Sequence, residues 1–395
     1  MVNSDFFSVL WKMFSKHCDN HCKRMDIVFD NYFDHSIKQQ ERIRRSKGDS
    51  IVTDIVNTEQ SLPVDMVSFW SCSQNKVAFQ QMFIKWIVPN NLERLTYLGG
   101  VNKDDPMSCM SILHGDITTE SSLWCASEEA DDRMMVHVNH AVLKGFENIV
   151  IASQDTDVLV TALYNHKFHW STTNLWILYG SNSNPDILSV NELTDVLDTS
   201  VVGILPAAHV LTGCDSTSKV STKNNLIKHV TDGKYNRYIE NFGIEDLDKD
   251  MIAAAEFFLV RLFSDVEDVK TFNDLRYSVY HKNSANLDLE KLPCTSNAIE
   301  QHIRKAYFQC RRWMNSAQAF FTDKVGEEYG YDVDDTDEGV IVTPIIVRGE
   351  TLPNDFPIPC TCGKCARDIS CPCRTKEIMC CVYCKCKADC KNPNN

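Results

Sequence analysis

Short apolar segments alternate with helical patterns along roughly the first 220 residues, and this alternation limits the fold more than any other feature of the chain. Residues 25–30 have the pattern of a buried strand that ends in a carboxylate, and residues 148–153 and 175–179 have the pattern of two further buried strands. Residues 130–144 are expected to form a helix that stops at Gly145. Apolar strands separated by helices predict an α/β fold with a doubly wound, mostly parallel sheet.

The second half of the chain has a different pattern. From about residue 244 to residue 319 it is helical, most clearly in residues 251–263 and 297–313. Residues 323–338 hold eight Asp or Glu and one Lys, which favours a solvated linker or loop.

Charge and hydropathy exclude some classes of protein. The formal net charge of −14 argues against a protein that coats nucleic acid by bulk electrostatics, although an acidic metal site remains compatible with it. No run of about 18 apolar residues is present, so we expect no membrane span. The first residues lack the pattern of a secretory signal, so we expect an intracellular protein.

Cysteines crowd together near the end of the sequence. Ten of the 18 lie between Cys360 and Cys390, and without a secretory signal such crowding favours metal thiolates over disulfides. With Cys381 set aside, nine thiolates can satisfy about three tetrahedral Zn²⁺ ions if some sulfurs bridge. The alternative is an oxidised or disordered tail. The nine predicted zinc ligands are Cys360, Cys362, Cys365, Cys371, Cys373, Cys380, Cys384, Cys386 and Cys390.

Carboxylates occur at the ends of the predicted strands and at the starts of the predicted helices. Ligands of a doubly wound sheet bind beyond the carboxyl ends of its strands, so these carboxylates are expected to converge. Converging carboxylates repel one another unless a cation neutralises them, and hard oxygen ligands suit Mg²⁺ or Mn²⁺. Taken singly, each could instead be a helix N-terminal, turn or loop residue. The candidates are Asp30, Glu129, Asp131, Asp155, Asp157 and Asp215.

Four motifs in a fixed order carry a resemblance to a known family. The segments are SEEADDRMM, SQDTDVLVTAL, LPAAHVLTGCDSTS and LPCTSNAIEQHIRKAYFQ, and the acidic parts of the first three resemble the motifs of PIN-like nucleases of the flap-endonuclease superfamily. They are more similar still to a group of uncharacterised animal proteins that are often associated with mobile elements. The resemblance covers roughly residues 20–315.

The resemblance implies a PIN-like α/β fold and hydrolysis of nucleic-acid phosphodiesters. It implies that Asp30 lies near the scissile phosphate and that Mg²⁺ or Mn²⁺ is held by Glu129, Asp131, Asp155, Asp157 and Asp215. It also implies that a run of basic residues lies beside the nucleic-acid entrance. The alternative interpretation of this run is an ordinary solvated helix. That run comprises Lys38, Arg42, Arg44, Arg45 and Lys47.

This chain departs from the PIN-like pattern in two places. The family has an earlier strand that ends in a further metal-binding aspartate, whereas the 24 residues before Met25 have a helical pattern. We therefore expect a site that lacks one carboxylate and one central strand, in a fragment or in a protein that has lost part of the site. After Asp215, where the family places glycines that approach a duplex, no glycine occurs before Gly233. Lys219 and Lys223 could contact phosphate there, although a solvated loop is the alternative.

The cysteine spacing resembles the tesmin/TSO1-like CXC domain, a zinc module that binds DNA. Ser370 stands where that family has a tyrosine that helps to contact DNA, so the resemblance favours zinc more strongly than DNA.

Together these patterns predict four parts: a PIN-like nuclease-type domain in 1–240, a helical extension in 241–322, an acidic linker in 323–355 and a zinc module in 356–395. DNA or RNA is the expected partner, and a nuclear location follows from that partner alone. The alternative function is a catalytically inactive factor, derived from a mobile element, that binds nucleic acid or protein.

Several further residues have a functional and a structural interpretation. Two groups of residues have the spacing of metal ligands: His137 with His140, and Cys18 with His21 and Cys22. Packing or surface roles are favoured for both groups. Cys214 is expected to be a buried thiol rather than a nucleophile. Tryptophans could stack on bases, but hydrophobic packing is the default for Trp70, Trp86 and Trp124.

Overall fold

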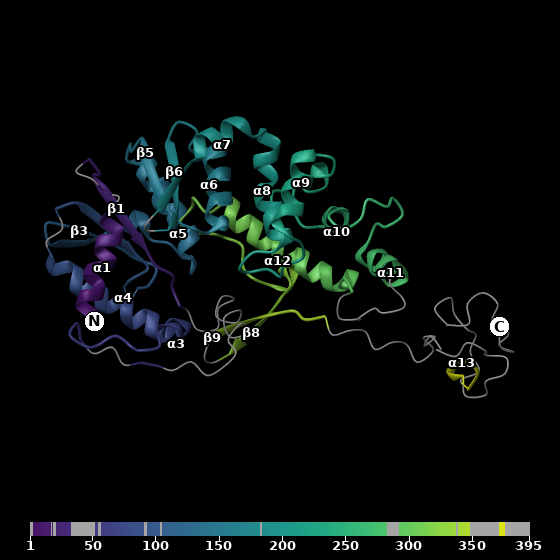
Figure 1. Ribbon diagram of the computed structural model, residues 1–395, viewed down its shortest axis with the longest axis horizontal. Coiled ribbons are helices and arrows are strands. Elements are labelled where there is room, and N and C mark those ends of the chain that lie inside the picture. The colour runs from purple at the N-terminus through teal and green to yellow at the C-terminus, as the bar shows by residue number, and fades with distance from the viewer. Residues whose placement is uncertain are drawn as a thin grey trace. The chain divides into compact units, whose positions relative to one another are not determined.

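The chain divides into two compact units, Met1–Ile346 and Val347–Asn395. The structure is a computed structural model (Figure 1). It describes residues 3–16, 18, 21–32, 52–53, 57–90, 93–102, 105–181, 184–282, 292–336, 339–347 and 371–375. The first unit is α/β with mixed sheets, which confirms the predicted class.

A four-stranded sheet forms the first part of this unit. Its order is β1-β2-β3-β4, where β1 and β2 are parallel and the remaining neighbours are antiparallel. The strands are β1 (Arg24–Val28), β2 (Leu95–Gly99), β3 (Cys109–Leu113) and β4 (Asp116–Thr119). The strand predicted at residues 25–30 is thus confirmed as β1, which ends two residues before Asp30.

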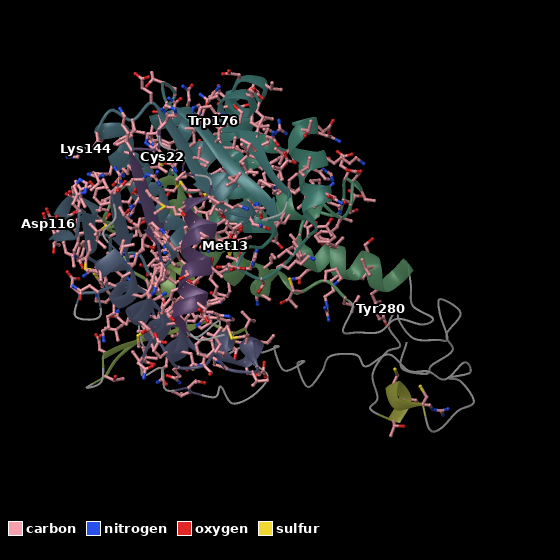
Figure 2. The ribbon with its side chains drawn as sticks, turned by 60° about the vertical axis from the view of Figure 1, so that its left-hand side comes forward. Met13, Cys22, Asp116, Lys144, Trp176 and Tyr280 are labelled. Atoms are coloured by element: carbon pink, nitrogen blue, oxygen red, sulfur yellow. The ribbon has the colours of Figure 1, made fainter. Side chains whose placement is uncertain are left out.

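Three helices pack against this sheet: α1 (Asn3–Ser15), α3 (Met66–Ser71) and α4 (Ser73–Ile87). Met25 and Ile27 of β1 pack with Phe7 of α1 and Phe83 of α4 in one apolar core. Helix α1, on which Met13 is labelled in Figure 2, confirms the helical pattern expected before Met25.

A separate three-stranded sheet has the order β5-β6-β7, where β5 and β6 are parallel and β6 and β7 antiparallel. Its strands are β5 (Asn148–Ala152), β6 (Asn174–Ser181) and β7 (Asn184–Ser189). Ile151 is buried in the core with α5 (Ala130–Leu143), α6 (Thr156–His169) and α7 (Val190–Val196). The prediction that β5 is buried is wrong for Val150, which is 58% exposed, because no described element covers that face of the strand at the sheet edge.

The prediction of a mostly parallel sheet is also wrong, since both sheets are mixed. Antiparallel pairing arises from tight turns that join consecutive strands. His114 and Gly115 connect β3 to β4 with φ of 52° and 87°, and two positive φ values are typical of the hairpin turn that brings consecutive strands together.

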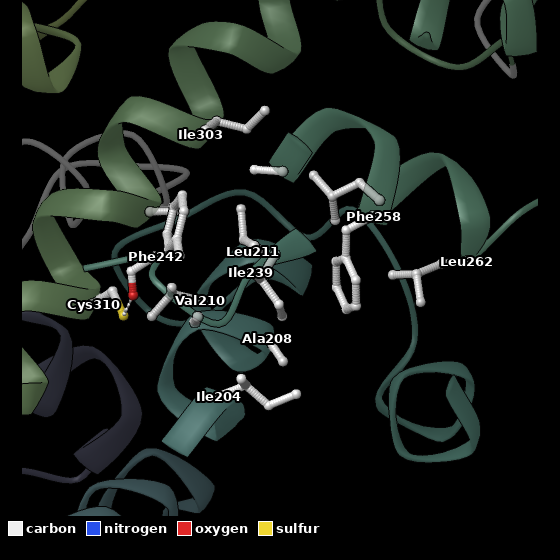
Figure 3. Packing of buried hydrophobic residues seen from close by; sticks show 14 of the residues in the cluster. Ile204, Ala208, Val210, Leu211, Ile239, Phe242, Phe258, Leu262, Ile303 and Cys310 are labelled. Carbon is white, nitrogen blue, oxygen red and sulfur yellow. Dashed lines mark hydrogen bonds between the residues drawn. The ribbon is translucent and has the colours of Figure 1, made fainter. Parts of the chain in front are cut away.

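Helices make up most of the remaining first unit (Figure 3). Val210 and Leu211 on α8 pack in one cluster with Phe258 of α10 and Ile303 of α12. This cluster confirms the helical patterns at residues 251–263 and 297–313. The helices are α8 (Thr199–Thr212), α9 (Lys223–Asp232), α10 (Lys249–Arg261), α11 (Phe272–Lys282) and α12 (Ser296–Met314). Short 3-10 helices are η1 (Val88–Asn90), η2 (Ser121–Leu123), η3 (Asn236–Tyr238) and η5 (Glu327–Tyr329).

Within the acidic stretch predicted to be a loop, a hairpin of β8 (Tyr331–Thr336) and β9 (Gly339–Pro344) forms instead. It is fastened to α12, where Lys305 Nζ donates to Ile345 O at 3.3 Å and the Phe308 ring lies 4.9 Å from that of Tyr329. The acidic residues of β8 are exposed, so their charge stays solvated while the backbone pairs.

Of the second unit the structure describes Val347 and residues 371–375, which include the short helix α13 (Pro372–Thr375) and the buried Cys371 and Cys373. Among the described helices of the whole chain, none alone is long and apolar enough to cross a membrane, and α7 and α8 reach that length and composition only as a pair bent by 112°.

Candidate functional site

Asp30 ties the end of β1 to the beginning of α5. Its Oδ1 accepts a hydrogen bond from the amide of Ala130 at 3.0 Å, and the Asn31 amide donates to Glu128 O at 2.9 Å. A carboxylate at a helix N-terminus is stabilised by the helix dipole and by the unpaired amides there. Residues 100 positions apart in the sequence are thereby brought together.

Asp131, in the first turn of α5, is the most perturbed carboxyl group of the site. Burial, together with the nearby charges of Asp155, Glu129, Asp132 and Asp30, raises the pKa of Asp131 to about 8. Charges act this strongly only at short range. Asp30, which follows β1, and Asp155, which follows β5, are thus both close enough to influence the charge of Asp131 at the start of α5.

Asp155 caps α6, because its Oδ1 accepts the amide of Asp157 at 2.9 Å. Partial burial raises the pKa of Asp155, as do the neighbouring charges of Asp157 and Asp215, whereas the hydrogen bond from the Asp157 amide lowers it. Asp155 thus links Asp131 electrostatically with the two remaining candidate carboxylates.

Asp157 is buried and is held by a histidine that the sequence analysis did not single out. Oδ1 of Asp157 lies 2.8 Å from Nε2 of His209, which is 5% exposed and projects from α8. The signal was present, since His209 lies within the same LPAAHVLTGCDSTS motif as Asp215, six positions earlier.

Asp215 is exposed on the loop that follows α8. Gly213 ends the helix with φ 115°, and the loop folds back so that the Val220 amide donates to Thr212 O at 2.9 Å. The neighbouring Cys214, which was predicted to be a buried thiol, is partly buried, and burial raises the pKa of its thiol.

An arginine from α12 reaches the same helix start. Nη2 of Arg312 donates to Asp132 Oδ2 at 2.7 Å and to Ser127 Oγ at 3.1 Å. Arg312 could not be identified from the sequence, because its partner Asp132 lies 180 positions away and no local pattern links them.

In the part of the chain that the structure describes, no three His, Cys, Asp or Glu side chains are arranged to hold a metal ion together. The basic run at Lys38, Arg42, Arg44, Arg45 and Lys47 lies outside the described residues, and so do seven of the nine predicted zinc ligands. Those seven are Cys360, Cys362, Cys365, Cys380, Cys384, Cys386 and Cys390.

The two histidines with metal-like spacing have structural partners. His137 Nδ1 lies 2.7 Å from Asp26 Oδ2, and His140 Nδ1 lies 2.9 Å from Nη1 of Arg24. Arg24 in turn holds Asp26 through two hydrogen bonds, so this buried network fastens α5 to β1.

The three tryptophans pack as the default interpretation predicts. Trp70 and Trp86 contact the core around Phe79 and Phe83, and the Trp124 ring stacks on that of Phe320 at 4.7 Å.

Comparison with protein-family models, with curated proteins and with solved structures finds no match to this chain.

Proposed function

We propose that the protein is a PIN-like, metal-dependent nuclease relative that hydrolyses nucleic-acid phosphodiesters with Mg²⁺ or Mn²⁺. The observation that carries the proposal is the convergence of carboxylates from four separate segments: the end of β1, the start of α5, the start of α6 and the loop after α8. Motif order in the sequence supports the same function independently.

The donor set fits a hard divalent cation. Glu129, Asp131, Asp155, Asp157 and Asp215 offer only oxygen ligands, and the mutual repulsion that raises the pKa of Asp131 is relieved when a cation binds. Because Mg²⁺ commonly retains several water ligands, it needs few direct protein contacts, which agrees with a site where no three described side chains are grouped around one point.

The topology also agrees with a PIN-like fold that lacks its central strand. Among the described residues, β1 pairs only with β2 and β5 only with β6. The carboxylates that follow both strands act on Asp131, and the Arg24 guanidinium at the start of β1 lies 5.7 Å from the ring of Phe146, two residues before β5. These two contacts link β1 with the segments before and after β5, which supports the proposal that a PIN-like sheet would join them through a further strand.

When bound, a divalent cation supplies positive charge to the phosphate and lowers the pKa of a water molecule. The protein supplies the positions. The Asp157 amide fixes Asp155, His209 orients the Asp157 carboxylate, and the amide of Ala130 holds Asp30 at the helix start.

Cleavage of labelled single-stranded and flap oligonucleotides with Mn²⁺ tests the proposal. We expect metal-dependent hydrolysis that falls at least about 100-fold in Asp155→Asn and in Asp157→Ala. Asp116→Asn, on the exposed strand β4 (Figure 2), is the matched control and should cleave like the wild type. Equal activity in the wild type and all three variants would show that Asp155 and Asp157 take no part in cleavage.

We propose in addition that the nine cysteines of the second unit hold about three Zn²⁺ ions. The spacing of the cysteines and the complete burial of Cys371 and Cys373 support this, because metal binding can supply the folding energy of a cysteine-rich segment whose sequence has few large apolar residues.

The second candidate is a factor that binds nucleic acid without cleaving it. The departures of the sequence from the PIN-like pattern favour it, since the strand that would supply a further carboxylate is replaced by the helix α1. It predicts oligonucleotide binding without turnover under every divalent cation, so the cleavage assay separates the two functions.

A further inference from the structure

We propose that Arg312 is the arginine that binds the substrate phosphate at the acidic site. The inference rests on the proposed nuclease function and adds to it a residue from the helical region, outside the motifs that suggested that function. A cluster of carboxylates repels a nucleic-acid backbone, so a cation of the protein at its rim has a clear role in binding.

The position of Arg312 is fixed by two contacts. Its Nη2 bonds both Asp132 and Ser127, and Ser127 Oγ also accepts the amide of Glu129 at 3.2 Å. The guanidinium is therefore tied to the peptide segment that carries Glu129 and Asp131. Burial lowers the pKa of Arg312, but the charges of Asp132 and Glu129 outweigh this and raise it, so the group stays charged.

Donors remain for a ligand. The Arg312 side chain is 18% exposed, and both of its hydrogen bonds to described residues use Nη2. No described residue accepts a hydrogen bond from Nη1 or Nε, and neither atom is buried without a partner. A guanidinium has five N–H donors in a planar fork that matches phosphate oxygens.

Two neighbouring arginines do not have this property. Arg133 is 1% exposed and donates to the carbonyls of Ser127, Pro106 and Cys125. Arg311 is 25% exposed, but all three of its nitrogens are engaged: Nε and Nη2 bond Asp323, and Nη1 donates to the Tyr307 hydroxyl at 3.5 Å. Arg312 is thus the arginine near the start of α5 that is both anchored and open.

A purely structural role, in which Arg312 only links α12 to α5, is the competing explanation. Salt dependence distinguishes the two roles. A side chain that neutralises one phosphate contributes about one unit to the slope of log affinity against log salt, whereas a linking residue changes stability without changing that slope.

The test uses the full chain, a fluorescein-labelled 12-nucleotide single strand and Ca²⁺ in place of Mn²⁺ to prevent cleavage. Fluorescence anisotropy across a salt series gives affinity and slope, and thermal unfolding gives stability. The variants are Arg312→Gln and Arg312→Lys, with Arg311→Gln as the matched control on the adjacent residue.

We expect Arg312→Gln to weaken binding about 10-fold and to reduce the slope by about one unit. Arg312→Lys keeps the charge and the pair with Asp132, so it should retain the slope with about threefold weaker binding. Arg311→Gln should change affinity less than about twofold. Wild-type affinity and slope in Arg312→Gln, with only a lower melting temperature, would show a linking role and overturn the inference.

The two proposals fail in different ways. If Asp157→Ala loses cleavage while Arg312→Gln binds like the wild type, the proposed nuclease function is supported and only the proposed role of Arg312 is wrong. A wild-type chain that neither binds nor cleaves the single strand overturns both.

Discussion

Asp131 has a partly buried carboxyl group that other carboxylates influence. Its pKa in the folded protein is about 8, against an ordinary value of 3.8, because of burial and the charges of Asp155, Glu129, Asp132 and Asp30. The folded protein therefore binds a proton that the unfolded chain releases between about pH 4 and pH 8. Stability falls as pH rises through this window, since the folded state retains more protons.

From this sign we predict that Asp131→Asn stabilises the metal-free protein at alkaline pH. The gain should be near zero at pH 4 and grow to about 2 kcal/mol at pH 8, because the amide does not ionise. Urea unfolding in EDTA at several pH values measures it. Asp116→Asn, exposed on β4, serves as control and should follow the wild type throughout. Parallel curves for wild type and Asp131→Asn would contradict the electrostatic account.

His209 illustrates how a site carboxylate depends on a partner from another element. In His209→Leu, the buried Oδ1 of Asp157 loses its hydrogen-bond partner, the His209 Nε2 that lies 2.8 Å away. We predict a loss of about 2 to 3 kcal/mol in the free energy of unfolding of the metal-free protein.

His209→Gln can still donate a hydrogen bond, so the loss should be about half as large. His169→Leu, at the exposed end of α6, controls for the added apolar surface and should cost less than about 0.5 kcal/mol. Chemical denaturation of the four proteins decides between them, and a neutral His209→Leu would show that the pair contributes nothing.

At the scale of elements, the turn after α8 determines where Asp215 can lie. A Cβ at Gly213 would come within 2.6 Å of Lys219 Cα and 2.7 Å of Ser218 O, and its φ of 115° disfavours other residues. Both neighbours are backbone atoms, so the loop itself must move. We predict that Gly213→Ala costs about 3 kcal/mol in stability and reduces cleavage by displacing Asp215.

Gly145 is the matched control for this substitution. It has a similar positive φ of 82°, but nothing lies within 4 Å of its Cβ position. Gly145→Ala should therefore cost only about 1 kcal/mol and leave cleavage unchanged. Equal losses in the two variants would mean that backbone conformation alone, and not the close approach of the loop, accounts for the effect at Gly213.

Elements whose signals are local were predictable from the sequence. The apolar run of β1, the end of α5 before Gly145 and the acidic residues that follow β1 and β5 all lie as expected. Strand pairing was not predictable in the same way, because it depends on contacts distant in sequence. The hairpins β3–β4 and β8–β9 and the division into two sheets were therefore missed.

The candidate site shows the same limit. Its acidic members could be identified because they follow strands, begin helices or, for Asp215, lie in a loop within one of the motifs. His209 and Arg312 acquire their roles only through Asp157 and Asp132, which lie 52 and 180 positions away. A buried polar residue of this kind has no local periodicity, so its function becomes visible only when the fold places its partner.

At the scale of the whole molecule, the chain consists of two units whose stability should have different sources. The first unit, Met1–Ile346, has several apolar cores, whereas the second holds the cysteine-rich segment. A segment with many thiols and little apolar core folds through its metal. Because the units are separately compact, removal of metal should affect one and spare the other.

We predict that the purified chain contains about three Zn²⁺ ions, measured by mass spectrometry of the metal, and that a strong zinc chelator removes them. The main thermal transition, which reports the first unit, should move by less than about 1 °C.

Cys373→Ser, at a fully buried thiol, should lose at least one ion. Cys381→Ser, outside the nine-thiolate spacing, should keep all of them because that sulfur is not needed as a ligand. If the chain contains no zinc and its cysteines are oxidised in pairs, the segment is a disulfide-linked tail and not a zinc module. If both serine variants lose the same amount of zinc, Cys381 is a ligand and the set of nine predicted ligands is wrong.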